Sequence, residues 1–139
     1  MLLEPLHAAE LPWIIRLQQL GDFGGLMKAV SDLGPSIYLI GALALVYLCW
    51  DARLGARLLL VYFTSGYVAY LGKLIFHTPR PWWMDATVRA HELHTSSYGF
   101  PSGHALIAAS VWFLLAHSLR GRLAWIGAGL IVAGVCFSR

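Results

Sequence analysis

The run LGARLLLVYFTSGYVAYLGKLIF, Leu54–Phe76, decides the fold of this chain because it is long and predominantly apolar. A helix needs about 20 apolar residues to cross a lipid bilayer, and this run reaches that length. Three more apolar stretches, Pro35–Trp50, His104–Leu119 and Leu123–Phe137, lie near the short end of the range. The sequence therefore predicts an all-α fold, a polytopic transmembrane helical bundle with about four membrane helices.

The composition also indicates a membrane protein. Hydrophobic residues make up 58% of the 139 residues and charged residues only 12%, and the mean hydropathy is +0.65. Soluble domains contain roughly 45–50% apolar residues. The net charge of +3 is small and no dense basic run exists, so nucleic acid is not expected as a partner.

Arginines in the short links predict the orientation of the helices. The links Asp51–Arg53 and Arg120–Arg122 lie on the same side of the membrane by parity. Cytoplasmic loops carry an excess of Lys and Arg, so these links are expected inside the cell. The Phe76–His104 connection and the C-terminus then lie outside. We therefore expect an integral protein of a bacterial inner membrane with its site on the outer, periplasmic face.

Residues 1–33 are less apolar than the rest of the chain. Apolar and polar residues alternate there at helical spacing, with glycines between them. Such a segment is typical of short amphipathic helices that lie in the membrane interface, and Trp13 is a candidate anchor. We therefore expect an N-terminal interfacial segment, 1–33, followed by a membrane domain, 34–139.

A cluster of reactive residues opens the third apolar stretch, in YGFPSGHALIAAS, Tyr98–Ser110. Ser102 is suited to cap the helix, because its hydroxyl can accept a hydrogen bond from an early backbone amide. Gly103 lets the backbone approach a bound group, and the first amides of a helix favour an anion. His104 can donate or accept a proton near neutral pH. The start of this helix is therefore predicted to hold an oxyanion.

Three cations are expected on the same side of the membrane as this helix start. Lys73 lies in the last turns of its apolar run, Arg80 precedes a proline, and Arg139 ends the sequence. Taken singly, Lys73 and Arg80 have ordinary explanations: a lysine that snorkels to the interface and an arginine in a loop. His104 alone could likewise be a capping histidine. Taken together, they predict a positive pocket of phosphate size.

These motifs resemble those of the type 2 phosphatidic acid phosphatase family, which is related to the vanadium haloperoxidases. The family pattern is K-x6-R-P, then P-S-G-H, then S-R-x5-H-x3-D. Residues Lys73–Pro81 and Pro101–His104 match the first two motifs in full, and Ser138-Arg139 matches the beginning of the third. Two complete motifs in this order, within an apolar chain, make the resemblance specific.

The resemblance implies a role for each matching residue. Five residues would bind the phosphate: Lys73, Arg80, Ser102, Gly103 and Arg139. His104 would be catalytic, as the general acid that protonates the leaving oxygen. The family forms a phosphohistidine on the histidine of the third motif and needs no metal. No metal and no cofactor are therefore expected here.

Part of the family pattern is absent from these 139 residues. The nucleophilic histidine and the aspartate that orients it would follow Arg139. We therefore expect 34–139 to be a truncated domain that binds an anion better than it hydrolyses an ester, because losing a nucleophile costs orders of magnitude in rate. The loop histidines His77, His91 and His94 are expected to be solvated or interfacial. The sequence HELH lacks the spacing and the third ligand of a zinc site.

The leading hypothesis is a membrane phosphatase that hydrolyses lipid phosphate monoesters or diphosphates through a phosphohistidine. Its partners would be membrane lipids and a substrate such as phosphatidate, phosphatidylglycerophosphate, a prenyl diphosphate or a sphingoid phosphate. Two alternatives stay open. One is a non-catalytic protein that binds anionic lipids; the other is a subunit that needs a complementing chain or forms a homo-oligomer. A channel is disfavoured because no helix carries a repeated polar stripe.

Overall fold

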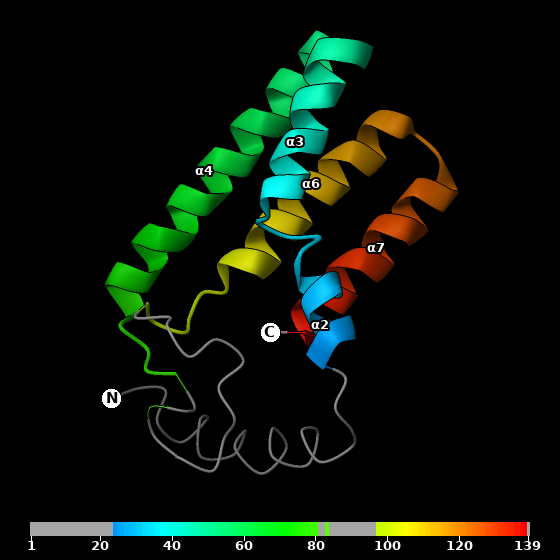
Figure 1. Cartoon of the computed structure of the whole chain (residues 1–139). Helices are drawn as coiled ribbons and strands as arrows, with labels where there is room; N and C mark the ends of the chain where they lie inside the picture. Colours follow the sequence, from blue (N-terminus) through cyan, green and yellow to red (C-terminus); the bar gives the residue numbers. More distant parts are fainter. Residues whose placement is uncertain (1–23, 81–82, 84–96, 139) are drawn as a thin grey trace.

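The computed structural model describes residues 24–80, 83 and 97–138. Within these ranges the secondary structure is helical and contains no strand. The helices are α2 (Gly24–Ser31), α3 (Ile37–Leu45), the π-helical turn η1 (Val46–Trp50), α4 (Ala52–Phe76), α6 (Gly103–Leu119) and α7 (Arg122–Phe137) (Figure 1). Each of the four apolar stretches forms a helix, so the all-α prediction is confirmed for the residues that are described.

The predicted interfacial segment, 1–33, is described only from Gly24 onward. Helix α2 contacts α7, and a Cβ at Gly134 of α7 would lie 3.1 Å from Cγ1 of Val30. Residues 1–23 lie outside the described residues. The interfacial location of the segment and the domain boundary after residue 33 therefore remain predictions.

Helix α4 is fixed at both ends by local hydrogen bonds. The Asp51 carboxylate accepts bonds from the amides of Arg53 (2.8 Å) and Leu54 (3.1 Å), which have no partner within the helix. The helix ends at His77, which adopts the left-handed conformation with a φ of 47°, and Pro79 follows. With 25 residues, α4 is about 37 Å long, so its two ends are far apart.

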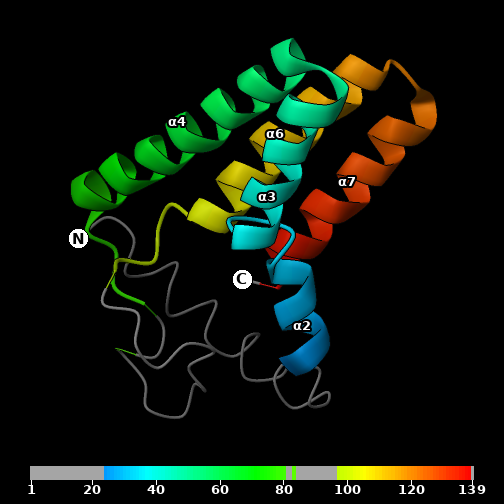
Figure 2. The ribbon, with the colours of Figure 1, turned by 45° about the horizontal axis from the view of Figure 1, so that its top comes forward.

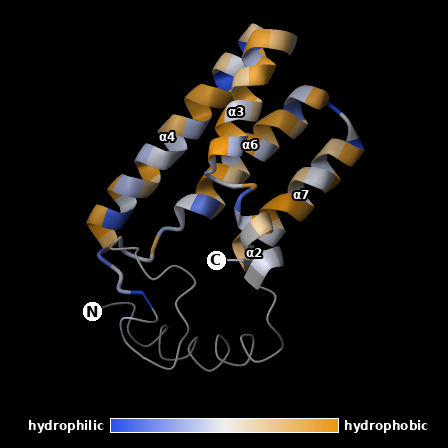
Figure 3. Ribbon diagram, in the orientation of Figure 1, coloured by the Kyte–Doolittle hydropathy of each residue, from blue (hydrophilic) through white to orange (hydrophobic). Residues whose placement is uncertain are grey.

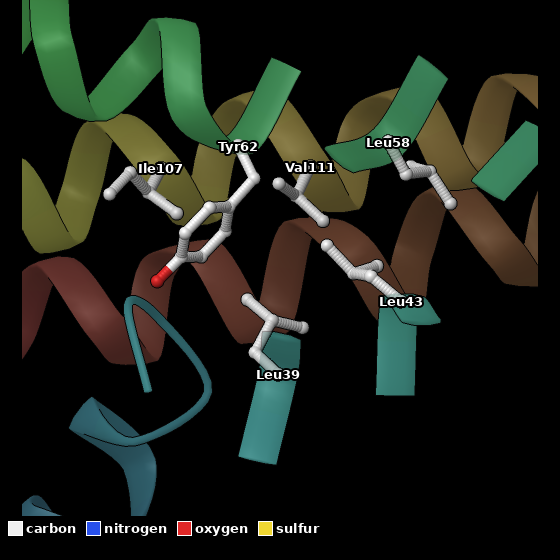
Figure 4. Close-up of a cluster of buried hydrophobic side chains, with 6 residues drawn as sticks. All are labelled: Leu39, Leu43, Leu58, Tyr62, Ile107 and Val111. Atoms are coloured by element: carbon white, nitrogen blue, oxygen red, sulfur yellow. The ribbon is translucent and has the colours of Figure 1, made fainter. Parts of the chain in front are cut away.

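The helices pack around one apolar core. Helices α4 and α6 lie side by side in both views of the ribbon, and α7 packs against α6 (Figures 1 and 2). Figure 4 shows the six core side chains, which come from α3, α4 and α6: Leu39, Leu43, Leu58, Tyr62, Ile107 and Val111. Close packing of these side chains holds the three helices together through many small van der Waals contacts.

The two tight links lie at the same end of the bundle (Figure 1). One joins η1 to α4 at Asp51, and the other joins α6 to α7 at Arg120 and Gly121. The C-terminal end of α4 and the N-terminal end of α6 lie at the opposite end. The two helical hairpins thus bring the ends that carry the sequence motifs together.

One described helix, α4, is long enough and apolar enough to cross a membrane, and only 22% of its most apolar window is buried. Three shorter apolar helices span Ile37–Trp50, Gly103–Leu119 and Arg122–Phe137. Figure 3 shows apolar residues along all of these helices and hydrophilic residues in the links. The predicted number of about four membrane helices stays a prediction.

Candidate functional site

Lys73 and Arg80 meet at one residue, Ser97. Lys73 lies in the last turn of α4, and its Nζ donates a hydrogen bond of 3.2 Å to Oγ of Ser97. Nη2 of Arg80 donates to the same oxygen at 3.0 Å, and Nε of Arg80 donates to the carbonyl oxygen of Ser97 at 2.7 Å. The two cations of the first motif therefore converge on a single hydroxyl.

Arg80 is held in a buried position, with 8% of its surface exposed. Burying a guanidinium is costly unless hydrogen bonds replace those it made to water. A backbone hydrogen bond also joins the segment before Arg80 to the segment after Ser97: the carbonyl of the buried Thr78 accepts a bond of 2.9 Å from the amide of Gly99. The direction of the Arg80 side chain is therefore set by both side-chain and backbone contacts.

The start of α6 has the predicted cap. Ser102 is the N-cap, and its Oγ accepts a hydrogen bond of 3.4 Å from the amide of Ala105. Gly103 is the first residue of the helix, and a Cβ there would lie 3.7 Å from Cβ of Ala69 on α4. The first turn of α6 therefore packs directly against α4, with its N-terminal amides at the same end of the bundle as Lys73.

Gly72 allows the two motifs to approach each other. A Cβ at this position would lie 2.7 Å from Cγ of Pro101, closer than real Cβ contacts come. The absence of a side chain at Gly72 is therefore required for α4 to contact the Pro101–His104 motif. Because Gly72 directly precedes Lys73, this contact brings the lysine of the first motif to the start of α6.

His104 lies in the first turn of α6 and is partly buried. The link between α2 and α3 contacts its backbone: a Cβ at Gly34 would lie 3.3 Å from the carbonyl oxygen of His104 and 3.5 Å from its Cα. The position of the predicted general acid is therefore set in part by a link that is distant in sequence.

The structure brings five of the six predicted site residues to one end of the bundle: Lys73, Arg80, Ser102, Gly103 and His104. The sixth, Arg139, lies outside the described residues, as do His91 and His94. His77 is exposed at the end of α4, and its ring contacts that of Tyr98 edge-on, with 4.8 Å between centroids. Among the described residues, no group of three or more His, Cys, Asp or Glu side chains could hold a metal ion.

Three residues that contact the site were not identified from the sequence: Ser97, Gly72 and Gly34. Ser97 stands in the run Thr95-Ser96-Ser97, where nothing distinguishes it from its neighbours. Gly72 offered a weak signal, because a glycine within an apolar helix lets a neighbouring backbone approach closely. Gly34 resembles an ordinary turn residue before Pro35.

The comparison with protein families identifies the chain. Residues 54–139, well over half of its length, match the PAP2 superfamily. The chain therefore belongs to this superfamily, the type 2 phosphatidic acid phosphatase-like family that its motifs resemble, and membership points to a phosphatase. The matched segment contains α6, α7 and all of α4 except its first two residues, whereas α2, α3 and η1 precede it. No curated protein and no solved structure matches the chain.

Proposed function

We propose that this protein is a membrane phosphatase that acts on lipid phosphate monoesters or diphosphates. The meeting of Lys73 and Arg80 at Ser97 carries the proposal. It places two cations at the end of the bundle where α6 begins, and helix N-terminal amides favour phosphate. Cations that hydrogen-bond a phosphate oxygen also make stronger bonds than neutral donors.

In this proposal, five residues bind the phosphate: Lys73, Arg80, Ser102, Gly103 and Arg139. The two side chains from the first motif would neutralise negative charge on the phosphate oxygens, and the amide of Gly103 would donate to another oxygen. Ser102 supports this role because it caps α6 and so fixes the direction of the first amides. The role of Arg139 rests on the family pattern alone.

The proposed reaction is a phosphohistidine mechanism. A histidine attacks phosphorus, the bond from phosphorus to the ester oxygen breaks, and His104 gives a proton to that leaving oxygen. Water then attacks the phosphohistidine, His104 takes a proton from the water, and phosphate and free histidine result. In the family pattern the nucleophilic histidine and its aspartate belong to the third motif, of which Ser138-Arg139 is the beginning in this chain.

Exposed apolar side chains support a location in the membrane. Ile37 on α3, Ile75 on α4 and Leu123 on α7 are 73%, 74% and 83% exposed. Large contiguous apolar surfaces on a protein mark contacts with a membrane or another protein. We propose that α3 with η1, α4, α6 and α7 each cross the bilayer, with tilt or local thinning of the bilayer compensating for the shorter helices.

The charges at the two ends of the bundle support an outward-facing site. Four exposed arginines lie near the tight links: Arg53, Arg57, Arg120 and Arg122. By the positive-inside rule, that end is cytoplasmic. The site at the other end would then face the periplasm of a bacterial inner membrane, where it would meet the phosphate of a lipid headgroup while the lipid chains remain in the bilayer.

The test is phosphate release from a short-chain phosphatidate in detergent. It compares the 139-residue chain with a form that also carries the third-motif histidine and aspartate. In the longer form, His104→Ala should lower the rate by about 10²–10⁴-fold, the usual contribution of a general acid. His117→Ala is the matched control, because His117 is exposed at the other end of the same helix.

Each outcome decides between the candidate functions. Turnover by the longer form that depends on His104 and not on His117 supports the phosphatase. Near wild-type turnover in His104→Ala contradicts the assigned general acid. Binding of phosphatidate without turnover in either form favours the second candidate, a non-catalytic protein that binds anionic lipids. Turnover by the 139 residues alone would require another nucleophile, from a loop histidine or a second chain.

A further inference from the structure

We propose that the rings of Phe76 and Phe100 form a specificity-determining surface, which binds the first carbons of an apolar chain attached to the phosphate. This inference rests on the proposed function, because it assigns the apolar part of the substrate to residues beside the same site. Neither phenylalanine is a specified residue of the family pattern. Their contact with each other, their exposure and their place next to Lys73 carry the inference.

The two rings form an apolar contact beside the polar contact between Lys73 and Ser97. Phe76 follows Lys73 by three residues on α4. Phe100 follows Ser97 by three residues in the segment that leads to α6. Side chains three residues apart on a helix are neighbours, with about 5–6 Å between their Cβ atoms. The rings of Phe76 and Phe100 meet edge-on with 5.2 Å between centroids. The same two segments are therefore joined by a charged contact and, next to it, by an aromatic one.

The pair is accessible although its rings contact each other. Phe76 is 54% exposed and Phe100 is 50% exposed. Ile75, the residue before Phe76, is 74% exposed, and apolar residues continue along α4 from this end (Figure 3). Contiguous exposed apolar surface marks a place of contact with a ligand, a membrane or a partner. Because this surface begins beside the cations of the first motif, it fits a molecule that carries an apolar chain next to a phosphate.

The position of the pair determines which part of such a molecule it contacts. The first carbons of a phosphate ester lie within a few bonds of the charged oxygens, so a surface that borders the phosphate site meets those carbons first. Aromatic rings offer a large apolar area for this contact. Covering one methylene group strengthens binding roughly fourfold. The hydroxyls of a sugar phosphate would instead lose hydrogen bonds to water there. The pair therefore favours esters with an apolar chain.

The segment that carries Phe100 has contacts with the α4 end that do not involve the ring. Nε of Arg80 donates to the carbonyl oxygen of Ser97 at 2.7 Å. The amide of Gly99 donates to the carbonyl oxygen of Thr78 at 2.9 Å. Both acceptors are backbone atoms, so these bonds stay available when a ring of the pair is replaced. Alanine substitutions of the pair thus remove apolar surface while these contacts are kept.

The experiment measures, by calorimetry, the affinity of the purified 139-residue chain in detergent for methyl phosphate and for hexyl phosphate. The two esters carry the same charged group and differ only in chain length, so the ratio of their affinities isolates the apolar contact. We expect the wild type to bind hexyl phosphate at least about tenfold more tightly than methyl phosphate. Phe76→Ala and Phe100→Ala should each lower this ratio at least about threefold, chiefly by weakening the binding of hexyl phosphate.

Two further variants control the measurement. Phe63→Ala is the matched control, because Phe63 is 61% exposed on α4 and meets the ring of Tyr62 edge-on at 5.3 Å. Phe63 precedes Lys73 by about 15 Å along the helix, so its variant should keep the wild-type ratio. This control also reports any uptake of hexyl phosphate by the detergent. Phe100→Leu keeps an apolar side chain and should retain most of the ratio.

A wild-type ratio in both alanine variants of the pair would overturn the inference, and so would an equal fall of the ratio in Phe63→Ala. Equal losses of affinity for the two esters in Phe76→Ala and Phe100→Ala would also overturn it, because the pair would then support the phosphate site and not the chain. If the wild type binds both esters equally well, the phosphate site stands and the chain-binding surface fails. If the wild type binds neither ester, the proposed function fails and the inference fails with it.

Discussion

The indole of Trp112 donates a hydrogen bond of 2.9 Å from Nε1 to the carbonyl oxygen of Leu33. Helical side chains lean toward the N-terminus of their helix, so Trp112 reaches back along α6 toward the site end. The next residue after Leu33 is Gly34, which contacts the backbone of His104. The link between α2 and α3 thus contacts α6, the helix that carries the predicted general acid, at two points. This link precedes the segment matched to the PAP2 superfamily.

The Trp112 bond should contribute to stability. Trp112→Phe keeps an aromatic ring but removes the donor, and we expect it to lower the free energy of unfolding by about 1 kcal/mol. Denaturant unfolding in detergent measures this change. Trp50→Phe is the control, because Trp50 is 75% exposed and should change stability little. Equal effects of the two substitutions would show that the Leu33 contact contributes nothing specific.

Gly72 should be intolerant of any side chain. In Gly72→Ala the added Cβ would meet Pro101, and relieving such overpacking costs about 1–3 kcal/mol. Gly72 adjoins Lys73, and Pro101 lies just before the start of α6. The clash should therefore move Lys73 away from the start of α6, and the affinity for phosphate should fall as well. Gly41→Ala in α3 is the matched control, since nothing lies within 4 Å of a Cβ there. Unaltered stability and affinity in Gly72→Ala would contradict the close approach of α4 and Pro101.

Two substitutions of Ser102 should separate capping from binding. Ser102→Ala removes the cap and should cost about 1 kcal/mol of stability, whereas glycine at an N-cap costs only a few tenths. Both remove the hydroxyl, so both should weaken phosphate binding. Ser36→Ala is the control, because Ser36 caps α3 through a 3.2 Å bond from the Leu39 amide and should affect stability alone. If Ser102→Gly binds phosphate as tightly as the wild type does, the Ser102 hydroxyl takes no part in phosphate binding.

The orientation of the bundle can be tested with single cysteines. In a background with Cys49 and Cys136 replaced by alanine, Asp32→Cys places a thiol at the site end and Arg53→Cys places one near a tight link. Both positions are exposed. A membrane-impermeant maleimide should label Asp32→Cys in spheroplasts and Arg53→Cys only after lysis. The reverse pattern would place the site in the cytoplasm.

The sequence predicted those features that depend on local pattern. The apolar runs became helices, and Ser102 became an N-cap, because both depend on residues close together in the chain. The contacts of Ser97 with Arg80 and of Gly34 with His104 could not be predicted. They arise where packing joins distant segments, and a serine or glycine in a loop carries no sign of its distant partner.

The binding of a short-chain phosphatidate, measured by calorimetry, tests the central claim most directly. The comparison is between the wild-type chain, Arg80→Ala and Arg57→Ala, which removes an exposed cation near the other end of α4. Wild type and Arg57→Ala should bind alike, and Arg80→Ala should bind at least about tenfold more weakly. Equal binding by all three forms, or equal losses in the two variants, would contradict a lipid phosphate site at the end of the bundle where Arg80 lies.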